Sequence, residues 1–224
     1  MKPIVITGGN GFLGRNICKA VSEAGLEAIS ISRSGKPADI DDSEYEQVQW
    51  LPADIFEPHS WSQTLKNAKA VIHCVGILEE DATKGFTHQR MIYETARIAG
   101  IEAEKAGVEK FVFVSASAGP PGTPDSYIAC KRKAEDCLSD KNFELAILCP
   151  GMLYGKERPD TIRTKNLLKV AGAIPIIGKK IREDHPLEVD VVAHVALMAA
   201  LDETVKGILT VQEMDKLYKE YYGS

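Results

Sequence analysis

The sequence lacks any long uninterrupted hydrophobic run, and it has no excess of basic residues. No stretch of about 18 apolar residues occurs, so nothing in the chain is predicted to span a membrane. With 27 Lys and Arg against 32 Asp and Glu, the 224-residue chain carries a net charge of −5. Nucleic-acid phosphates bind clustered positive charge, so this balance does not favour a nucleic-acid partner.

Cysteines are few, and they form no metal-binding pattern. The chain has five, and no two are spaced as a CxxC pair: Cys18, Cys74, Cys130, Cys137 and Cys149. An odd number without such pairs argues against a zinc site and against a disulfide framework. His73, His185 and His194 are isolated from one another in the sequence, so we interpret them as structural or surface residues.

From the first residues of the sequence we expect no leader of the usual kinds. An apolar, strand-like run begins within MKPIVITGG, before any secretory core or arginine-rich presequence. From the residues alone we expect a cytosolic protein, and import into an organelle by an internal signal stays open.

The sequence does contain a repeated alternation of short apolar strands and amphipathic helices. Strands are predicted at residues 3–7, 28–32, 47–50, 70–75, 110–116, 145–150 and 207–211. Helices are predicted at 12–24, 59–68, 86–106, 126–139, 162–170, 189–201 and 213–222, with a solvated loop at 34–46. Val- and Ile-rich strands without polar alternation fit a parallel sheet covered on both faces. We therefore predict a Rossmann-type, doubly wound α/β fold, with a nucleotide-binding domain at 1–155 and a small C-terminal region at 156–224 packed on it.

A glycine-rich turn joins the first predicted strand to the first predicted helix. The segment TGGNGFLG (7–14) places its glycines at GxxGxxG spacing. A tight turn, a close approach of the backbone to a pyrophosphate, and close helix–strand packing each need a residue without Cβ. Free N–H groups at the helix N-terminus then face the phosphates. The predicted dinucleotide contacts here are Thr7, Gly8, Gly11, Phe12, Leu13 and Gly14.

The residues that follow the later strands predict which dinucleotide is bound. NAD usually has its ribose 2′-hydroxyl bound by an acidic residue after the second strand, whereas Ser32 and Arg33 stand there in this chain. Arginine suits the 2′-phosphate of NADP, so NADP(H) is favoured over NAD(H), and a plain surface arginine is the alternative. Further cofactor contacts at the carboxyl edge of the sheet are expected from Asp54, Ile55, Cys74, Val75 and Gly76.

Together these motifs resemble the extended and atypical branches of the short-chain dehydrogenase/reductase superfamily over nearly the whole chain. The resemblance is carried by TGGNGFLG, the Asp54–Ile55 pair, FVFVS, YIACK, CPGMLYG (149–155) and HPLEVDVVAHV (185–195). More narrowly, ISRSGK, QVQW followed by ADIFEP, GIL and YIACKRKAE are similar to a fungal mitochondrial member of ubiquinone biosynthesis and to the NADPH-binding accessory subunit of respiratory complex I. That resemblance implies a mitochondrial, quinone-related role.

The resemblance also implies a set of catalytic residues. In the superfamily a tyrosine four residues before a lysine is the general acid/base, and these residues are Tyr127 and Lys131 here. The lysine and the oxidised nicotinamide lower the tyrosine pKa, which is otherwise ~10 and too high for a base at neutral pH. Cys149 stands where the family commonly has arginine. The residues expected around the nicotinamide are Ser115, Tyr127, Lys131, Pro150, Gly151 and Met152.

The third catalytic position departs from the family pattern. The family places two hydroxyl residues at the end of the fifth strand, and the second is catalytic, whereas this chain reads VSAS with Ala116 in that register. On an ideal strand Ser115 and Ser117 point away from the side that Ala116 faces. A bulge or a turn beginning at Ala116 would bring Ser117 around, and GPPGTP (119–124) follows immediately. Two hypotheses stay open: Ser117 supplies the hydroxyl, or the site binds cofactor without full catalysis.

Two functions follow from these alternatives. One is an NADP(H)-dependent oxidoreductase acting on a small molecule, a quinone or isoprenoid intermediate. The other is a non-catalytic NADP(H)-binding accessory or assembly protein of a quinone-biosynthesis or respiratory complex. The part after residue 155 is short for an extended member, which predicts a small or open substrate pocket. The tail LYKEYYGS (217–224) is expected to form a docked amphipathic helix, and contact with a partner or a membrane surface is the alternative.

Overall fold

The computed structural model of the protein describes residues 2–119, 123–157 and 184–223 and is built on a seven-stranded parallel sheet. The order across the sheet is β3-β2-β1-β4-β5-β6-β9, and all six neighbouring pairs are parallel. The strand order reverses between β1 and β4, which is where such sheets bind ligands. The predicted doubly wound fold is therefore confirmed. The strands are β1 (Ile4–Thr7), β2 (Ala28–Ser32), β3 (Val48–Pro52), β4 (Ala70–His73), β5 (Lys110–Val114), β6 (Glu144–Leu148) and β9 (Gly207–Leu209).

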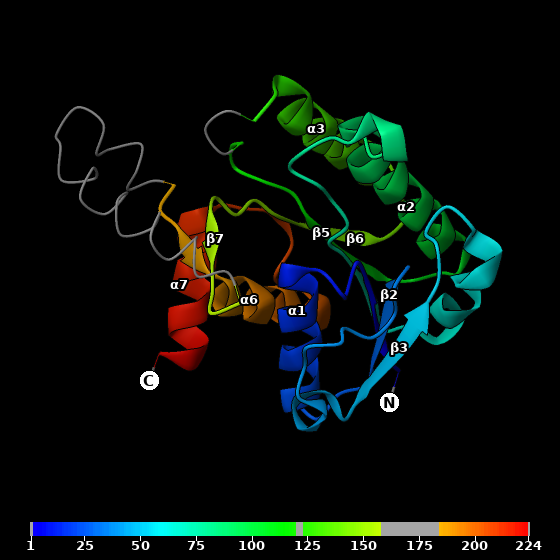
Figure 1. The fold of residues 1–224 in the computed structure, drawn as a ribbon. Coiled ribbons are helices and arrows are strands. Elements are labelled where there is room, and N and C mark those ends of the chain that lie inside the picture. Colours follow the sequence, from blue (N-terminus) through cyan, green and yellow to red (C-terminus); the bar gives the residue numbers. More distant parts are fainter. Residues whose placement is uncertain (1, 120–122, 158–183, 224) are drawn as a thin grey trace, which may run out of the picture.

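Helices cover both faces of the sheet (Figure 1). On one face α1 (Phe12–Glu23) packs against α6 (Val189–Leu201), which in turn carries α7 (Val211–Tyr222). On the other face α2 (Thr95–Lys105) lies beside α3 (Asp125–Ser139). Successive residues of a strand point to opposite faces, so β5 contributes apolar side chains to a separate core on each side. The sheet is therefore packed against one hydrophobic core on each of its two faces.

The segment predicted as one helix at 59–68 is instead two short 3-10 turns, η2 (Pro58–Ser60) and η3 (Ser62–Asn67). Trp61 lies between them with a φ of −140°, outside the helical region, and its side chain is buried. The prediction of a single helix was wrong here because burial of this ring takes the backbone off the helical path.

Two other segments also differ from their predicted form. The helix predicted at 86–106 begins with a π-helical turn, η5 (Gln89–Glu94), and continues as α2. The loop predicted at 34–46 is not solvated throughout, because it contains the 3-10 turn η1 (Asp42–Tyr45), and the ring of Tyr45 is buried against Trp50. A shorter 3-10 turn, η4 (Ala82–Lys84), lies before η5.

The C-terminal residues add the last strand of the sheet. The strand predicted at 207–211 ends at Leu209, because Thr210 caps α7 in a reciprocal pair of hydrogen bonds with Glu213. A separate two-stranded pair is formed by β7 (Leu153–Tyr154) and β8 (Leu187–Glu188). The helix predicted at 162–170 lies outside the described residues. In the described ranges no helix is long and apolar enough to cross a membrane.

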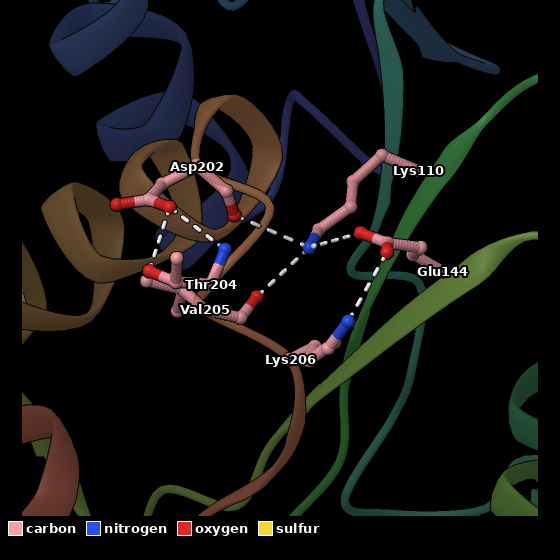
Figure 2. A network of polar contacts seen from close by, with 6 residues as sticks. All are labelled: Lys110, Glu144, Asp202, Thr204, Val205 and Lys206. Atoms are coloured by element: carbon pink, nitrogen blue, oxygen red, sulfur yellow. Dashed lines mark hydrogen bonds and ion pairs between the residues drawn. The ribbon is translucent and has the colours of Figure 1, made fainter.

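A buried lysine fastens the amino end of the sheet, as Figure 2 shows. Lys110 begins β5 and donates to the carbonyl oxygens of Val205 at 2.9 Å and Asp202 at 3.2 Å, and to the Glu144 carboxylate at 3.4 Å. The exposed Lys206 binds the other oxygen of Glu144 at 3.2 Å. Since Asp202 ends α6, the buried cation lies at the negative end of that helix. Lys110 thus joins β5, β6 and α6.

Candidate functional site

The carboxyl ends of strands β1 to β4 surround a cavity of about 580 Å³. That volume is typical of sites for small molecules and cofactors. Ten of the residues predicted to contact the cofactor line it: Thr7, Gly8, Gly11, Ser32, Arg33, Asp54, Ile55, Cys74, Val75 and Gly76. The parallel sheet brings these residues together because all four strands end at the same edge.

The glycine-rich turn at the cavity has the shape of a pyrophosphate cradle. Gly8 has a φ of +84°, and a Cβ there would lie 3.0 Å from the backbone nitrogen of Val75. A Cβ at Gly14 would lie 2.1 Å from the Gly8 carbonyl oxygen, so only glycine allows α1 to pack on the turn. Gly11 is the N-cap of α1, and no side chain caps the N–H groups of the first turn. Those N–H groups fit an anionic pyrophosphate.

The remaining predicted contacts lie outside the lining of this cavity. Leu13 is buried in the core, so it can offer a ligand only its backbone, and Phe12 is half-buried with its ring 3.0 Å from where a Cβ of Gly155 would be. The other residues that do not line the cavity are Gly14, Ser115, Ser117, Tyr127, Lys131, Pro150, Gly151 and Met152.

Lys131 nevertheless lies next to a residue that lines the cavity. It is buried on α3, where its Nζ donates to the Val114 carbonyl at 2.7 Å and lies 5.1 Å from the centre of the Phe113 ring. A Cβ at Gly76 would lie 3.5 Å from that Nζ, so the ammonium stands directly behind a cavity residue. Of its three donors, one has an acceptor in the described part of the chain. Burial lowers the pKa of Lys131 to about 8, although nearby Cys74 acts in the opposite direction.

Tyr127 lies one helical turn before Lys131 and is half-buried. Burial raises the pKa of Tyr127, so its phenol is protonated at neutral pH. The Tyr–Lys spacing predicted the opposite direction. The difference arises because the Lys131 ammonium is held at Val114 and desolvation decides the tyrosine pKa.

A histidine that the sequence did not single out packs against Tyr127. His88 is fully buried, and its ring lies edge-on to the Tyr127 ring with 5.6 Å between centres. Its Nε2 is 3.0 Å from the Leu78 carbonyl oxygen and its Nδ1 is 2.8 Å from the Ser126 hydroxyl. Because a carbonyl oxygen can only accept, Nε2 carries the proton and Nδ1 accepts from Ser126. His88 therefore fastens residues 78–88 to the start of α3.

Both serines that flank Ala116 are engaged by other groups. The Ser115 hydroxyl donates to the Glu135 carboxylate. The Ser117 hydroxyl donates to the Asp184 carboxylate and lies 3.3 Å from the Pro150 carbonyl oxygen. Neither hydroxyl is directed at the cavity, so the predicted substitution of Ser117 for the missing hydroxyl would require it to leave Asp184.

Beyond the end of β5 at Val114, the hydrogen-bond register with the neighbouring segment continues past Ala116. The N–H of Ser115 donates to the Leu148 carbonyl at 2.8 Å, and the N–H of Ser117 donates to the Pro150 carbonyl at 2.9 Å. Two residues on one strand match two on the other, so no extra residue is inserted and no bulge forms. The bulge is therefore absent at Ala116. The chain does bend at Ser117 and Ala118, but this bend leaves the Ser117 hydroxyl on the Asp184 carboxylate.

Arg132 holds the backbone at the same point. Its Nη2 donates to the carbonyl oxygens of Ala116 at 2.9 Å and Ser117 at 3.3 Å, and its Nη1 pairs with Glu135. The Cys149 sulfur lies 3.9 Å from Nη1, so an arginine from α3 fills the space beside the position where the family commonly has its own. Burial raises the pKa of the Cys149 thiol, which keeps the sulfur uncharged.

His73 ends β4 behind the cavity and is uncharged. It is fully buried, its Nδ1 is 2.7 Å from the Thr7 hydroxyl, and its ring stacks against those of Phe111 and Phe113. Burial lowers the pKa of His73 to about 3. Among the described residues no group of three or more His, Cys, Asp or Glu could hold a metal ion.

Sequence reasoning missed three cavity residues that bear on ligand chemistry. Phe56, Phe86 and Arg90 line the same cavity as the glycine-rich turn. Each lies in a segment between regular elements or in an irregular turn, so no periodic pattern marked it. Phe56 follows the end of β3, whereas Phe86 and Arg90 reach the site through the folding of residues 78–90 over the sheet edge.

The fold and the cradle define a dinucleotide-binding protein of the Rossmann class. Residues 8–176 match the family model described as NAD(P)H-binding, which spans more than half of the chain. The chain therefore belongs to the NAD(P)H-binding family, among the atypical short-chain dehydrogenases/reductases.

Known proteins of several kinds are similar to this chain. MIOREX complex component 2 of Saccharomyces cerevisiae is 27% identical over 95% of this chain and 98% of its own length. Ceramide reductase of Caulobacter vibrioides is 29% identical over 78% of this chain and 52% of its own length, and mitochondrial protein FMP52 of Meyerozyma guilliermondii is 24% identical over 97% and 95%. The solved UDP-N-acetylglucosamine 4-epimerase of Bacillus cereus shares the fold with a TM-score of 0.67, at 16% identity over 100% of this chain and 82% of that one.

Proposed function

We propose that the protein is an NADP(H)-dependent oxidoreductase that reduces a carbonyl of a quinone or isoprenoid intermediate in mitochondrial ubiquinone biosynthesis. The observation that carries this proposal is the position of Lys131. Its buried ammonium lies one helical turn from Tyr127 and directly behind Gly76 of the cofactor cavity, and the described residues satisfy one of its three donors. Burying an ammonium with unused donors costs free energy, so such a residue is typical of a site that needs the charge.

The protonation of Tyr127 supports reduction as the direction of the reaction. A reduced nicotinamide supplies a hydride to the carbonyl carbon when the cofactor is bound. Tyr127, which burial keeps as a neutral phenol, donates its proton to the carbonyl oxygen. The Lys131 ammonium then stabilises the phenolate that remains, since an opposite charge nearby favours the ionised form.

Arg33 supports NADP(H) as the cofactor. Its side chain is exposed at the end of β2 and lines the cavity, where NAD-specific proteins usually carry an acidic residue. A guanidinium there would pair with the 2′-phosphate that NADP(H) carries and NAD(H) lacks.

The relatives and the narrower resemblance support the substrate class and location. One relative is named a ceramide reductase, which agrees with reduction of a lipid-like molecule. Another is named as mitochondrial, which agrees with the resemblance to a mitochondrial protein of ubiquinone biosynthesis.

A non-catalytic NADP(H)-binding accessory protein is the second candidate function. Ala116 replaces the family's catalytic hydroxyl, and the hydroxyls of Ser115 and Ser117 are bound to carboxylates. The name of the yeast relative, a complex component, agrees with this alternative. Here bound nucleotide would stabilise the fold and a partner surface by mass action.

The cofactor is tested by thermal-shift titration of the full chain with NADPH and NADH. We expect NADPH to raise the Tm more than NADH at equal concentration, because a ligand that binds only the folded state stabilises it. Equal shifts, or none, would contradict the assignment of NADP(H).

Catalysis is tested by Tyr127→Phe in cells that depend on this gene for ubiquinone. We expect ubiquinone production to fall while the purified variant still binds NADPH. A bulky substitution, Gly11→Val, serves as the cofactor-binding control. Normal ubiquinone production with Tyr127→Phe, together with its loss with Gly11→Val, would contradict the enzyme and favour the non-catalytic accessory protein.

A further inference from the structure

Two arginines from distant parts of the chain line the cavity and contact the same short segment, Gly85–Phe86. We propose that Arg90 is the second arm of a phosphate-binding pair with Arg33, and that the pair binds a phosphomonoester, the 2′-phosphate of NADP(H). This inference rests on the proposed function and adds a specificity-determining residue to it. Arg33 follows β2, whereas Arg90 lies on η5, 57 residues later in the chain.

The two guanidinium groups converge on one short segment. The Arg33 Cζ lies 4.7 Å from the centre of the Phe86 ring. The adjacent Gly85 has a φ of +70°, and a Cβ there would lie 3.1 Å from Nη1 of Arg90. Both arginines and Phe86 line the cavity that contains the glycine-rich turn. The pair therefore belongs to the same ligand site as the pyrophosphate cradle.

Within residues 2–119, 123–157 and 184–223, neither arginine is paired with a carboxylate. Among the described residues Arg33 and Arg90 form no ion pair, although the chain has more acidic than basic residues. Arg15 is paired with Asp39, and the third cation of the cavity, Lys84, is paired with Asp81 at 2.8 Å. Two like charges that face one pocket repel each other, and a bound dianion removes that repulsion.

The neighbouring aromatic rings leave the hydrogen-bonding edges of both arginines available. Arg33 lies over Phe86, and Arg90 lies over Phe56 with its Cζ 4.5 Å from the ring centre. A guanidinium held against an aromatic face still presents its N–H donors around its rim. This fixes the planes of the groups in advance and suits the fork geometry that phosphate oxygens accept.

The test compares four proteins by calorimetric titration: the wild-type chain, Arg33→Gln, Arg90→Gln and Arg97→Gln. Arg97 is exposed on α2 and does not line the cavity, so its substitution makes the same charge change as a control. The ligands are NADPH, NADH, adenosine 2′-monophosphate and inorganic phosphate. We expect Arg90→Gln to lower the affinity for NADPH and for adenosine 2′-monophosphate about tenfold, and the affinity for NADH less than about twofold. Arg97→Gln should leave all three nucleotide affinities unchanged.

Equal weakening of NADPH and NADH by Arg90→Gln, or no weakening of NADPH, would overturn the inference. If inorganic phosphate displaces NADPH as well as adenosine 2′-monophosphate does, the pair is a general anion site and the assignment to the nucleotide is also overturned. Arg90→Lys keeps the charge without the planar fork, so its affinity for NADPH should fall about threefold. This variant replaces Arg90→Gln in the test if the glutamine variant does not fold. A wild-type chain that binds no NADPH would instead contradict the proposed function itself.

Discussion

Two lysines at opposite ends of the sheet are equally buried and differ in how their charge is used. Lys110 at the amino end and Lys131 at the carboxyl end each expose 5% of their surface. The Lys110 ammonium has two carbonyl oxygens and a carboxylate around it (Figure 2). The Lys131 ammonium has one carbonyl oxygen and an aromatic face. A fully satisfied buried charge holds structure together, whereas an under-satisfied one is typical of a functional site.

The two ammonium groups differ in their number of acceptors because different parts of the chain lie next to the two ends of the sheet. At the amino end, the turn after α6 folds back and delivers its carbonyl groups to Lys110. At the carboxyl end the strand order reverses, which leaves the cavity in front of Lys131 and Gly76. The cavity keeps protein acceptors away from Lys131, and its pKa falls to about 8 as a consequence of burial.

Lys110→Met tests the structural role of Lys110 and has the largest expected effect on stability. The substitution leaves the Glu144 carboxylate and two carbonyl groups without their shared donor, so we expect the free energy of unfolding to fall by about 3 kcal/mol. Urea denaturation of the full chain measures it. Lys206→Met, which removes the exposed partner of the same carboxylate, should cost less than about 0.5 kcal/mol. Similar losses for the two variants would contradict the structural role of Lys110.

His73 sharpens the comparison, because it is a second buried base at the carboxyl end that is held uncharged. Its pKa is lowered from 6.5 to about 3, so between these values the unfolded chain binds a proton that the folded chain does not. Stability should therefore fall as the pH drops through this window, by about 2 kcal/mol between pH 7.5 and pH 5 from this residue. The measurement is the difference in urea midpoints between wild type and His73→Gln at the two pH values. A parallel decline of the two proteins would contradict it.

Lys131→Met tests the functional side. We expect it to weaken NADPH binding at least about tenfold, through loss of the ammonium, and to change the free energy of unfolding by less than about 1 kcal/mol, because the cost of burying the charge disappears with it. Fluorescence titration and urea denaturation measure the two quantities. Lys133→Met, an exposed lysine on the same helix, is the matched control.

The pH dependence of Lys131 provides a separate check on the same variant. Its pKa is lowered in the folded protein, so the unfolded chain binds more protons between pH 8 and about 10.5. Wild type should therefore gain stability relative to Lys131→Met as the pH rises through this window. A loss of NADPH binding that is matched by a comparable loss of stability would place Lys131 with Lys110 as a structural residue.

Ser126→Ala has the smallest expected effect, on the segment that covers the cavity. Removing the hydroxyl that donates to His88 should cost about 1 kcal/mol. Hydrogen exchange of the amides of residues 78–88 should speed up, because His88 then loses its link to α3. Ser139→Ala, at the far end of α3, should leave exchange in that segment unchanged. Unchanged exchange in both variants would show that His88 does not fasten the segment.

Local rules were enough to predict the fold and half of the site. The glycine spacing, the apolar strands and Arg33 placed a nucleotide at the carboxyl edge of a parallel sheet, since each depends on neighbours within one turn or one strand. Trp61 shows the limit, because only its burial in the core explains the break in the predicted helix. Arg90 and His88 carried no sequence signal, since their contacts lie in other segments.

The sequence by itself determined that this chain folds as a parallel α/β sheet with a dinucleotide cradle and places Tyr127 and Lys131 one helical turn apart. It could not determine the protonation of that pair, because a pKa depends on burial and on charges contributed by distant segments. Nor could it decide whether a bulge follows Val114, since strand pairing with residues 148–150 sets that register. Only the tertiary structure made Lys110 a structural residue and left Lys131 with two donors that have no acceptor among the described residues. The acceptors around a buried ammonium come from other parts of the chain.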